Sequence, residues 1–427
     1  MKKTKTNIAV GFALVFSAAT SADNFITDSV NDDIVEAGDI IQIALPATGL
    51  FAAWVHDDFE GAKQQVYTLG STIAMVGTGK FVVGRTRPNK SNTASYPSGH
   101  TAAAFSGASF LYNRYGASWG LPAYAAATFV GASRVHGNRH YADDVLAGGG
   151  IAFLNSRYWV SEFEPDGVNV LAVPKDDGVM LTVQIDNQAF DYNKSTKQRT
   201  VSAKDYRYKH SFTLNLGADL HDSMGDIDSN PTFEHSKPLD PNQPFSSALY
   251  EYKLDKDTSI EFNLSPNETR REGTIIGSLT LDKTTYNEGE EFIASLRQWG
   301  FGANYLKQWR VNEDLFLSAG GGLFGYYIEL QSELTGGGKY ESIRDNLLLP
   351  SVAAKAQYYL APKWSVTSRM DLQYFDDHSF YAEAGIHYHV TPSWQVGAQY
   401  GYAYSNWRDI KLSYESQVAM LSITNRF

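Results

Sequence analysis

Along the last part of the chain, apolar and polar residues alternate one by one, and no other feature of the sequence restricts the fold as strongly. Between 394 and 405 every second residue is apolar or aromatic, and the residues between them are small or polar. The same period of two runs through 352–360, 364–374 and 380–390. Successive side chains of a β-strand point to opposite faces, so these segments predict strands with one apolar and one polar face.

The connections between these segments indicate how the strands are arranged. Ala361-Pro362-Lys363 and Thr391-Pro392-Ser393 are short and each precedes a tryptophan, whereas the connection at 335–345 is longer and polar. Short turns on one side, longer loops on the other and aromatic residues at the strand ends are typical of transmembrane β-barrels. The chain also stops on Phe427 within a strand, which resembles the terminal strand of bacterial outer-membrane proteins.

We therefore expect an antiparallel transmembrane β-barrel of roughly 8–12 strands over residues 179–427. Such a barrel implies the outer membrane of a Gram-negative bacterium, with the lipids of that membrane and the barrel assembly machinery as partners. A soluble β-sandwich with one solvated face is the alternative. The many Tyr and Trp residues on the apolar face argue against it.

Residues 23–160 follow a different, helical pattern. Their apolar stretches are rich in Ala and Gly and lie at 40–55, 67–83, 101–115, 121–135 and 145–160. We expect an all-α helical bundle here, joined to the barrel by a linker at 161–178 that is rich in Pro and Asp. Polar residues such as Gln42 and Asn155 interrupt the stretches, and none is an unbroken apolar span of about twenty residues. A water-soluble bundle is therefore favoured over a membrane-embedded one.

The start of the chain and its composition restrict where the protein is located and which partners and chemistry are possible. Lys2, Lys3 and Lys5 precede an apolar run at 8–19 and small residues up to Ala22, which predicts a secretory signal peptide at 1–22. The net charge of −11 argues against a nucleic-acid partner, because no basic surface would offset phosphate repulsion. The chain has no cysteine, which excludes disulfides, thiolate nucleophiles and cysteine metal sites.

Three short pieces of the helical part carry residues suited to phosphoryl transfer. The reaction spreads negative charge over three oxygens, so it needs fixed cations. Lys80, Arg87 and Arg134 supply that charge, the two arginines as planar forks. Ser98 and Gly99 come directly before a predicted helix, where unpaired amides and the helix dipole favour an anion.

Two histidines then divide the proton and nucleophile chemistry between them. Asp144 lies four residues after His140, so on a helix the carboxylate would orient the imidazole. We expect His140 to attack phosphorus and form a phosphohistidine, with His100 as the general acid. No metal or other cofactor is needed in this mechanism, since the cations take that role.

The spacing of the three pieces resembles a known family. Lys80-x6-Arg87-Pro88, Pro97-Ser98-Gly99-His100 and Ser133-Arg134-x5-His140-x3-Asp144 are similar to the motifs of the type-2 phosphatidic acid phosphatase superfamily. That superfamily includes bacterial acid phosphatases and vanadium haloperoxidases, and the resemblance covers about residues 40–160. It implies a helical fold and the same roles for these residues. One departure is Ala142-Asp143, where Pro-Ser is common, so the neighbouring Asp143 competes for the orienting role.

The sequence thus predicts a phosphatase acting on a lipid or small phosphoester, with its helical domain on the periplasmic side of the outer membrane. Lipid candidates are phosphatidate, polyprenyl diphosphates and lipid A phosphates. One alternative is a vanadium-dependent haloperoxidase, the only reading with a cofactor, vanadate. Another is a non-catalytic barrel with a decayed helical appendage. Arg85, His136 and Arg139 lie near the motifs but outside their pattern, and we expect rim or bystander roles, with Arg85 open as a further cation.

Overall fold

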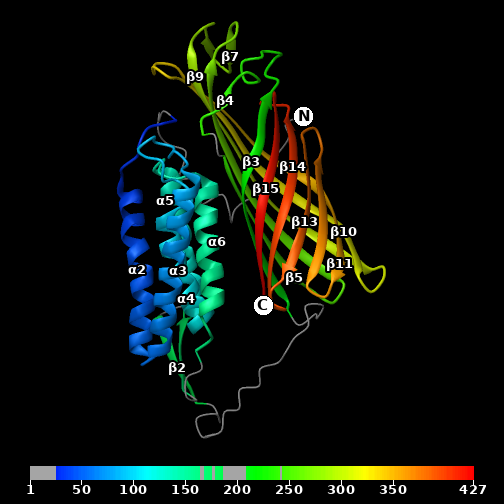
Figure 1. Cartoon of the computed structure of the whole chain (residues 1–427). Helices are drawn as coiled ribbons and strands as arrows, with labels where there is room; N and C mark the ends of the chain where they lie inside the picture. The colour runs from blue at the N-terminus through cyan, green and yellow to red at the C-terminus, as the bar shows by residue number, and fades with distance from the viewer. Residues whose placement is uncertain (1–25, 164–167, 176–177, 186–207, 241–242) are drawn as a thin grey trace.

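The computed structural model describes residues 26–163, 168–175, 178–185, 208–240 and 243–427. Within them a helical half is followed by a β-barrel, and the two stand side by side (Figure 1). The two-part architecture predicted from the sequence is therefore confirmed. The predicted signal peptide lies outside the described residues.

Five helices form the described part of the helical half: α2 (Asp33–Val55), α3 (Phe59–Val83), α4 (Gly99–Tyr115), α5 (Ala117–His136) and α6 (Ala142–Trp159). Local signals fix several of their ends. The carboxylate of Asp32 accepts a hydrogen bond from the Val35 amide at the start of α2, and Gly84 ends α3 in the left-handed region at φ 63°. Helix α4 lies at the centre and packs against the other four.

The helices approach one another closely because small residues line their contacts. Ala104, Ala108 and Ala127 are fully buried in the core of the bundle. At Gly107 of α4 a Cβ atom would lie 2.5 Å from the carbonyl carbon of Leu45 and from the nitrogen of Pro46 in α2. The Ala- and Gly-rich composition is thus the reason that α2 and α4 can cross backbone to backbone.

Ten antiparallel strands close the barrel. They are β3 (His210–Gly225), β5 (Pro244–Lys253), β6 (Thr258–Thr274), β9 (Glu291–Arg310), β10 (Leu315–Leu334), β11 (Tyr340–Ala361), β12 (Trp364–Tyr374), β13 (His378–His389), β14 (Trp394–Trp407) and β15 (Leu412–Arg426). Strand β6 pairs with both β5 and β9, which leaves no open edge in the ring. The strand number falls within the predicted range.

In the part of the chain that the structure describes, five shorter strands lie outside the ring. Strand β4 (Lys237–Pro238) pairs with β6, and β7 (Leu279–Leu281) pairs with β8 (Thr284–Tyr286). Strands β1 (Val168–Lys175) and β2 (Gly178–Ile185) form a separate hairpin. The barrel thus begins at β3, later than the predicted start at residue 179. The reason is local pairing, because β1 and β2 satisfy each other while β3 is bonded on both sides by β15 and β5.

The two ends of the barrel differ. At the short-turn end the connections are 254–257, 311–314, 362–363 and 390–393, and β3 begins and β15 ends there. At the long-loop end the connections include 226–243 and 275–290. Outward side chains between the ends are apolar and exposed, among them Val352, Met370 and Leu421. The predicted alternation of apolar and polar faces is confirmed.

The lumen of the barrel is polar, and several of its charged groups are paired. Arg369 bonds Glu261 and Asp371, Lys355 also bonds Glu261, and Glu383 accepts from the hydroxyl of Tyr381. These contacts are those of a satisfied polar interior rather than of a second catalytic site.

The helical half lies against the outer wall of this barrel (Figure 1). Helix α6 packs along β3, β5 and β6, and Ile151 and Leu154 form a cluster with the outward side chain of Leu214, which is fully buried. Near the short-turn end, Phe153 meets Phe212 with ring centroids 4.7 Å apart. This contact is largely apolar, and near its short-turn end Arg157 of α6 donates to the side-chain oxygen of Asn425 on β15. The two halves therefore pack against each other along α6.

The close crossing at Gly107 predicts the cost of adding a methyl group there. Gly107→Ala forces apart the backbones of α2 and α4 and should destabilise the bundle by about 1–3 kcal/mol. Gly70→Ala is the matched control, because a Cβ atom at Gly70 of α3 meets nothing within 4 Å. Thermal melts followed by far-ultraviolet circular dichroism in detergent should show a lower midpoint for Gly107→Ala alone. Equal midpoints would contradict the close packing.

Candidate active site

The three motif pieces meet at one end of the helical bundle. The starts of α2, α4 and α6, the ends of α3 and α5 and the loop 84–98 lie together there. This end lies beside the long-loop half of β6, since Arg85 bonds the backbone carbonyl of Glu268. The antiparallel order of the helices brings residues from distant parts of the sequence into one site.

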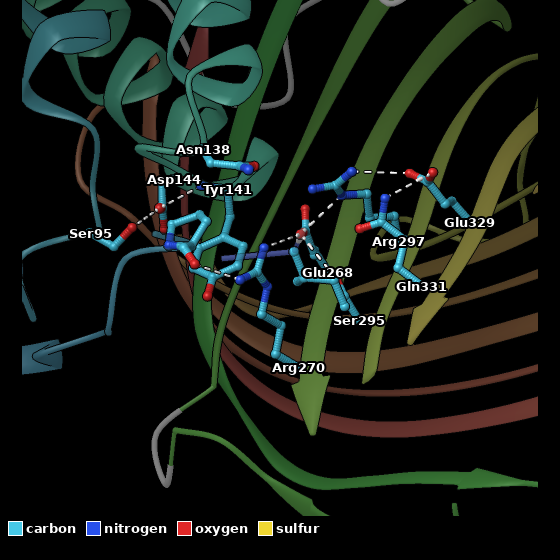
Figure 2. Close-up of polar contacts among 12 residues, drawn as sticks. Ser95, Asn138, Tyr141, Asp144, Glu268, Arg270, Ser295, Arg297, Glu329 and Gln331 are labelled. Atoms are coloured by element: carbon cyan, nitrogen blue, oxygen red, sulfur yellow. Dashed lines mark hydrogen bonds and ion pairs between the residues drawn. The ribbon is translucent and has the colours of Figure 1, made fainter. Parts of the chain in front are cut away.

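His140 and Asp144 form the pair that the spacing predicts, although the contact is loose. His140 is buried in the loop before α6, and its Nδ1 lies 3.4 Å from Oδ2 of Asp144. That oxygen also accepts hydrogen bonds from the Ser95 hydroxyl and from the Tyr141 amide, at 2.5 and 2.9 Å (Figure 2). The carboxylate is therefore held in place independently of the imidazole that it faces.

Arg85 has a larger role than its sequence position indicated. It is almost fully buried, and its Nη1 donates to Asp143 at 2.7 Å and to Asp144 at 2.8 Å. Its guanidinium lies 3.7 Å from the centroid of the Tyr141 ring. Asp143 is thus the partner of Arg85 and leaves Asp144 to face His140. In the sequence, the adjacent carboxylates of Asp143 and Asp144 were the only indication that a cation such as Arg85 is buried beside them.

His100 lies at the first turn of α4 and faces a carboxylate that the sequence did not single out. Its Nε2 is 3.2 Å from Oδ1 of Asp39, and the same oxygen accepts a hydrogen bond from Nη1 of Arg134 at 2.5 Å. Arg134 is buried and also donates to the carbonyl of Val35. Asp39 thus joins the predicted acid to a predicted phosphate ligand. In the sequence, Asp39 is an acidic residue at the edge of the apolar stretch 40–55, and this position was the only available indication of a functional role.

The remaining predicted ligands lie around the same space. Lys80 donates to the carbonyl of Ala94 at 2.6 Å, and its Cε is 3.8 Å from where a Cβ atom of Gly99 would be. Ser98 caps α4, and its amide donates to the carbonyl of Asp144 at 2.9 Å, which fixes the start of α4 against α6. Arg87 is half-buried and lies close enough to Lys80 and His140 to act on both electrostatically. All eight predicted site residues are therefore brought together, and their individual roles stay predictions.

His136 and Arg139, for which rim or bystander roles were expected, both contact residues just before α2. His136 contacts the carboxylate of Asp32 at 2.7 Å, and Arg139 bonds Asn31. Both therefore tie the end of α5 to the segment before α2. Within the described part of the chain, no group of three His, Asp or Glu side chains is placed to hold a metal ion.

Burial sets the protonation of the predicted nucleophile. It lowers the pKa of His140 below the usual value of 6.5, although Asp144 acts in the opposite direction. The nearby charges of Lys80 and Arg87 lower the pKa of His140 further. The imidazole is thus neutral at neutral pH, which is the form that can attack phosphorus.

Comparison with known proteins identifies the family of the helical half. Residues 61–164 match the model of the PAP2 superfamily, so this part of the chain is a PAP2 superfamily domain, and the barrel follows it. The chain is 35% identical over 142 residues to a lipid A 1-phosphatase of Porphyromonas gingivalis, which covers 30% of this chain and 32% of the relative. It is 37% identical over 79 residues to a lipid A 4'-phosphatase of Helicobacter pylori, which covers 18% of this chain and 40% of that protein. The match thus spans well under half of either relative.

Solved structures give weaker similarities. The structure of Aquifex aeolicus LpxE aligns with 31% of this chain and 88% of its own, at 19% identity and a TM-score of 0.27. The outer-membrane protease OmpT of Escherichia coli aligns with 53% of this chain and all of its own, at 9% identity and a TM-score of 0.33. One similarity concerns about a third of the chain and the other about half, and neither is strong enough to support a conclusion about function.

The shared carboxylate predicts that Asp39 matters to catalysis. In Asp39→Asn the His100 imidazole and the Arg134 guanidinium lose their common anionic partner, so both become less well positioned. We expect kcat for a phosphomonoester to fall roughly 10–100-fold. Glu36→Gln is the control, since Glu36 is exposed one turn earlier on α2. Steady-state kinetics of the two variants would contradict the role of Asp39 if both matched the unmodified protein.

Proposed function

We propose that this protein is a lipid phosphatase of the PAP2 type, held in the outer membrane by its barrel. The observation that carries the proposal is the buried His140, which Asp144 faces on one side while Lys80 and Arg87 lie within electrostatic range. A neutral nucleophile beside fixed cations is what attack on a phosphate anion requires. The relatives named as lipid A phosphatases support a lipid substrate.

The proposed reaction has two steps. Because Nδ1 of His140 faces Asp144, Nε2 is the nitrogen that attacks phosphorus. In the free protein, burial and the charge of Arg134 lower the pKa of His100 to about 4, and the negative charge of a bound phosphate opposes this shift so that His100 can hold a proton. The bond from phosphorus to the leaving oxygen breaks, and His100 gives that oxygen its proton. A water molecule then attacks the phosphohistidine, His100 takes a proton from it, and inorganic phosphate leaves. Lys80, Arg87 and Arg134 stabilise the charge on the non-bridging oxygens, so no metal ion takes part in this scheme.

The barrel supports a location in the outer membrane. Its ring of strands is closed, its outer wall is apolar and exposed, and its lumen is polar. Closed barrels with this distribution satisfy every backbone group inside a bilayer, which open sheets do not. A phosphate carried by a membrane lipid is thus the substrate most easily presented to the site. Phosphatidate, polyprenyl diphosphate and lipid A are the candidates to compare.

Loss of the nucleophile should abolish the activity. For His140→Ala we expect kcat to fall at least 1,000-fold on lipid A, phosphatidate and undecaprenyl diphosphate, because the covalent route is lost. His136→Ala is the matched control, since His136 contacts Asp32 at the rim. Phosphate release by the purified chain is the measurement. Hydrolysis by His140→Ala at the rate of the control would refute the mechanism, and vanadate-dependent halide oxidation without hydrolysis would favour the haloperoxidase.

The protonation of His140 predicts the acid side of the pH profile. The attacking imidazole must be neutral, and its pKa is lowered, so the neutral form persists below pH 6.5 and kcat/KM should decline only at lower pH. Because the Asp144 carboxylate raises the pKa of His140, Asp144→Asn should move this decline to still lower pH while reducing kcat. Profiles of kcat/KM for both proteins test the two shifts. An acid-side decline with its midpoint above pH 6.5 would contradict the buried, neutral histidine.

A further inference from the structure

The position of the helical half relative to the barrel has a consequence for the substrate. Helix α6 lies on the outer wall, over β3, β5 and β6, so the bundle occupies space that a barrel in a membrane would give to lipid (Figure 1). The bundle is not appended beyond either end of the barrel. Whatever layer surrounds the outer wall must therefore surround the bundle as well.

The helices have the length and composition for such a layer. Helices α2 and α3 have 23 and 25 residues, about 35 and 38 Å at 1.5 Å per residue, and both are apolar enough to cross a membrane. No Asp, Glu, Lys or Arg occurs in the middle portions of the five helices, namely 40–55, 64–79, 101–113, 117–133 and 145–156. The faces of α2 and α3 that point away from the bundle are apolar, with Ile43 68% and Ile73 59% exposed. A surface of this kind is costly in water and favourable in lipid.

Aromatic residues mark one boundary of the apolar layer on both halves. Six of the eight tryptophans lie at or near the short-turn end, three on the helices and three on the strands: Trp54, Trp119, Trp159, Trp309, Trp364 and Trp394. Tyr158 of α6 and Trp394 of β14 bring the two sets together, with ring centroids 6.1 Å apart. Tryptophan is enriched where a bilayer meets water, so one boundary runs across bundle and barrel alike.

A row of ion pairs marks the opposite boundary. On the outer wall, Glu268, Arg297, Glu329 and Arg344 are direct cross-strand neighbours on β6, β9, β10 and β11. Arg297 bonds Glu268 at 3.1 Å and Glu329 at 3.0 Å, as Figure 2 shows. One step toward the short-turn end come Trp299 and Tyr327, with ring centroids 5.2 Å apart, and beyond them the exposed apolar wall begins. Charges followed by aromatic rings and then apolar side chains are the order of a membrane interface.

The candidate active site lies at the level of this row. The carboxylate of Glu268 belongs to the row, while its carbonyl accepts from Arg85, the residue that bonds Asp144. Close by, Arg270 donates to the carbonyl of Pro88 at 2.7 Å. From here α6 runs 18 residues, about 27 Å, to the tryptophan boundary, which is close to the thickness of a hydrocarbon core. The site is thus at the headgroup level, on the long-loop side.

We propose that the helical half is embedded in the outer membrane beside the barrel, and that its active site opens at the cell-surface face, where it takes the phosphate of an outer-leaflet lipid. In outer-membrane barrels the short turns face the periplasm and the long loops face outside, which sets the direction. This placement differs from the periplasmic, water-soluble domain that the sequence predicts. The substrate rests on the proposed phosphatase function, whereas the placement does not.

Cysteine labelling tests the placement without reference to activity, because the natural chain has no cysteine. Four single variants sample both ends of both halves: Ser91→Cys and Lys283→Cys at the site and the long-loop end, Ser118→Cys and Lys256→Cys at the opposite end. In intact cells a membrane-impermeant maleimide should label the first two at least tenfold more than the last two. Permeabilising the outer membrane should make all four reactive.

The barrel variants serve as internal references for the bundle variants. If Lys283→Cys reacts in intact cells and Ser91→Cys does not, the bundle is not open to the surface and the proposal is wrong. If Lys256→Cys reacts instead of Lys283→Cys, the barrel has the opposite direction and the proposal is equally wrong. Either outcome leaves the phosphatase assays unaffected, so a failed placement and a failed function can be told apart.

Spin labels test the embedding itself. Ile43→Cys and Ile73→Cys should report high oxygen and low nickel-chelate accessibility in liposomes, as should Met370→Cys, which is exposed on the barrel wall. Ser91→Cys gives the reference for water. If the two helical positions behave like Ser91→Cys rather than Met370→Cys, the bundle lies in water and the embedded placement is excluded.

Discussion

The buried guanidinium of Arg85 is the contact on which the arrangement of both halves depends. It neutralises Asp143 and Asp144 on α6, stacks on Tyr141 and donates to a carbonyl of the barrel strand β6. Two adjacent carboxylates buried without a cation would be costly to desolvate, so the site requires this partner. The same side chain thus holds the orienting aspartate and docks the helical half on the barrel wall.

Docking gives the barrel a role in the site as well as in the membrane. Arg270 and the carbonyl of Glu268, both on β6, contact the loop that carries Arg85 and Pro88. Asp240, in the long connection between β3 and β5, accepts from the amide of Thr86. The loop between α3 and α4 is therefore positioned by strands as much as by helices. The Ala-rich helices have short side chains, and these contacts with the barrel explain how the charged site at the end of the bundle is held rigid.

The proposed chemistry and the proposed placement are both explained by the free energy of charged groups at a membrane boundary. A cationic site for phosphate is stable at the boundary between lipid and water, where lipid headgroups lie, and costly in the apolar middle. The structure has its charges at both ends of the helices and none between them. Lipid phosphates are found at the same depth as the site would be. The membrane would therefore align substrate and site without any movement of the protein.

The sequence by itself determined the type of most elements and which residues form the candidate site. The period of two along 352–405 predicts strands because a strand has two faces. The spacing of His140 and Asp144 predicts that they face each other, although the pair forms across the start of α6, with His140 in the loop before it, and not along one helix. It did not reveal Asp39 or the role of Arg85, whose partners lie 95 and about 60 residues away along the chain. Only the tertiary structure decided that α6 lies along the outer wall and that the site is level with the long loops. Such placement follows from long-range packing between halves, which local periodicity does not encode.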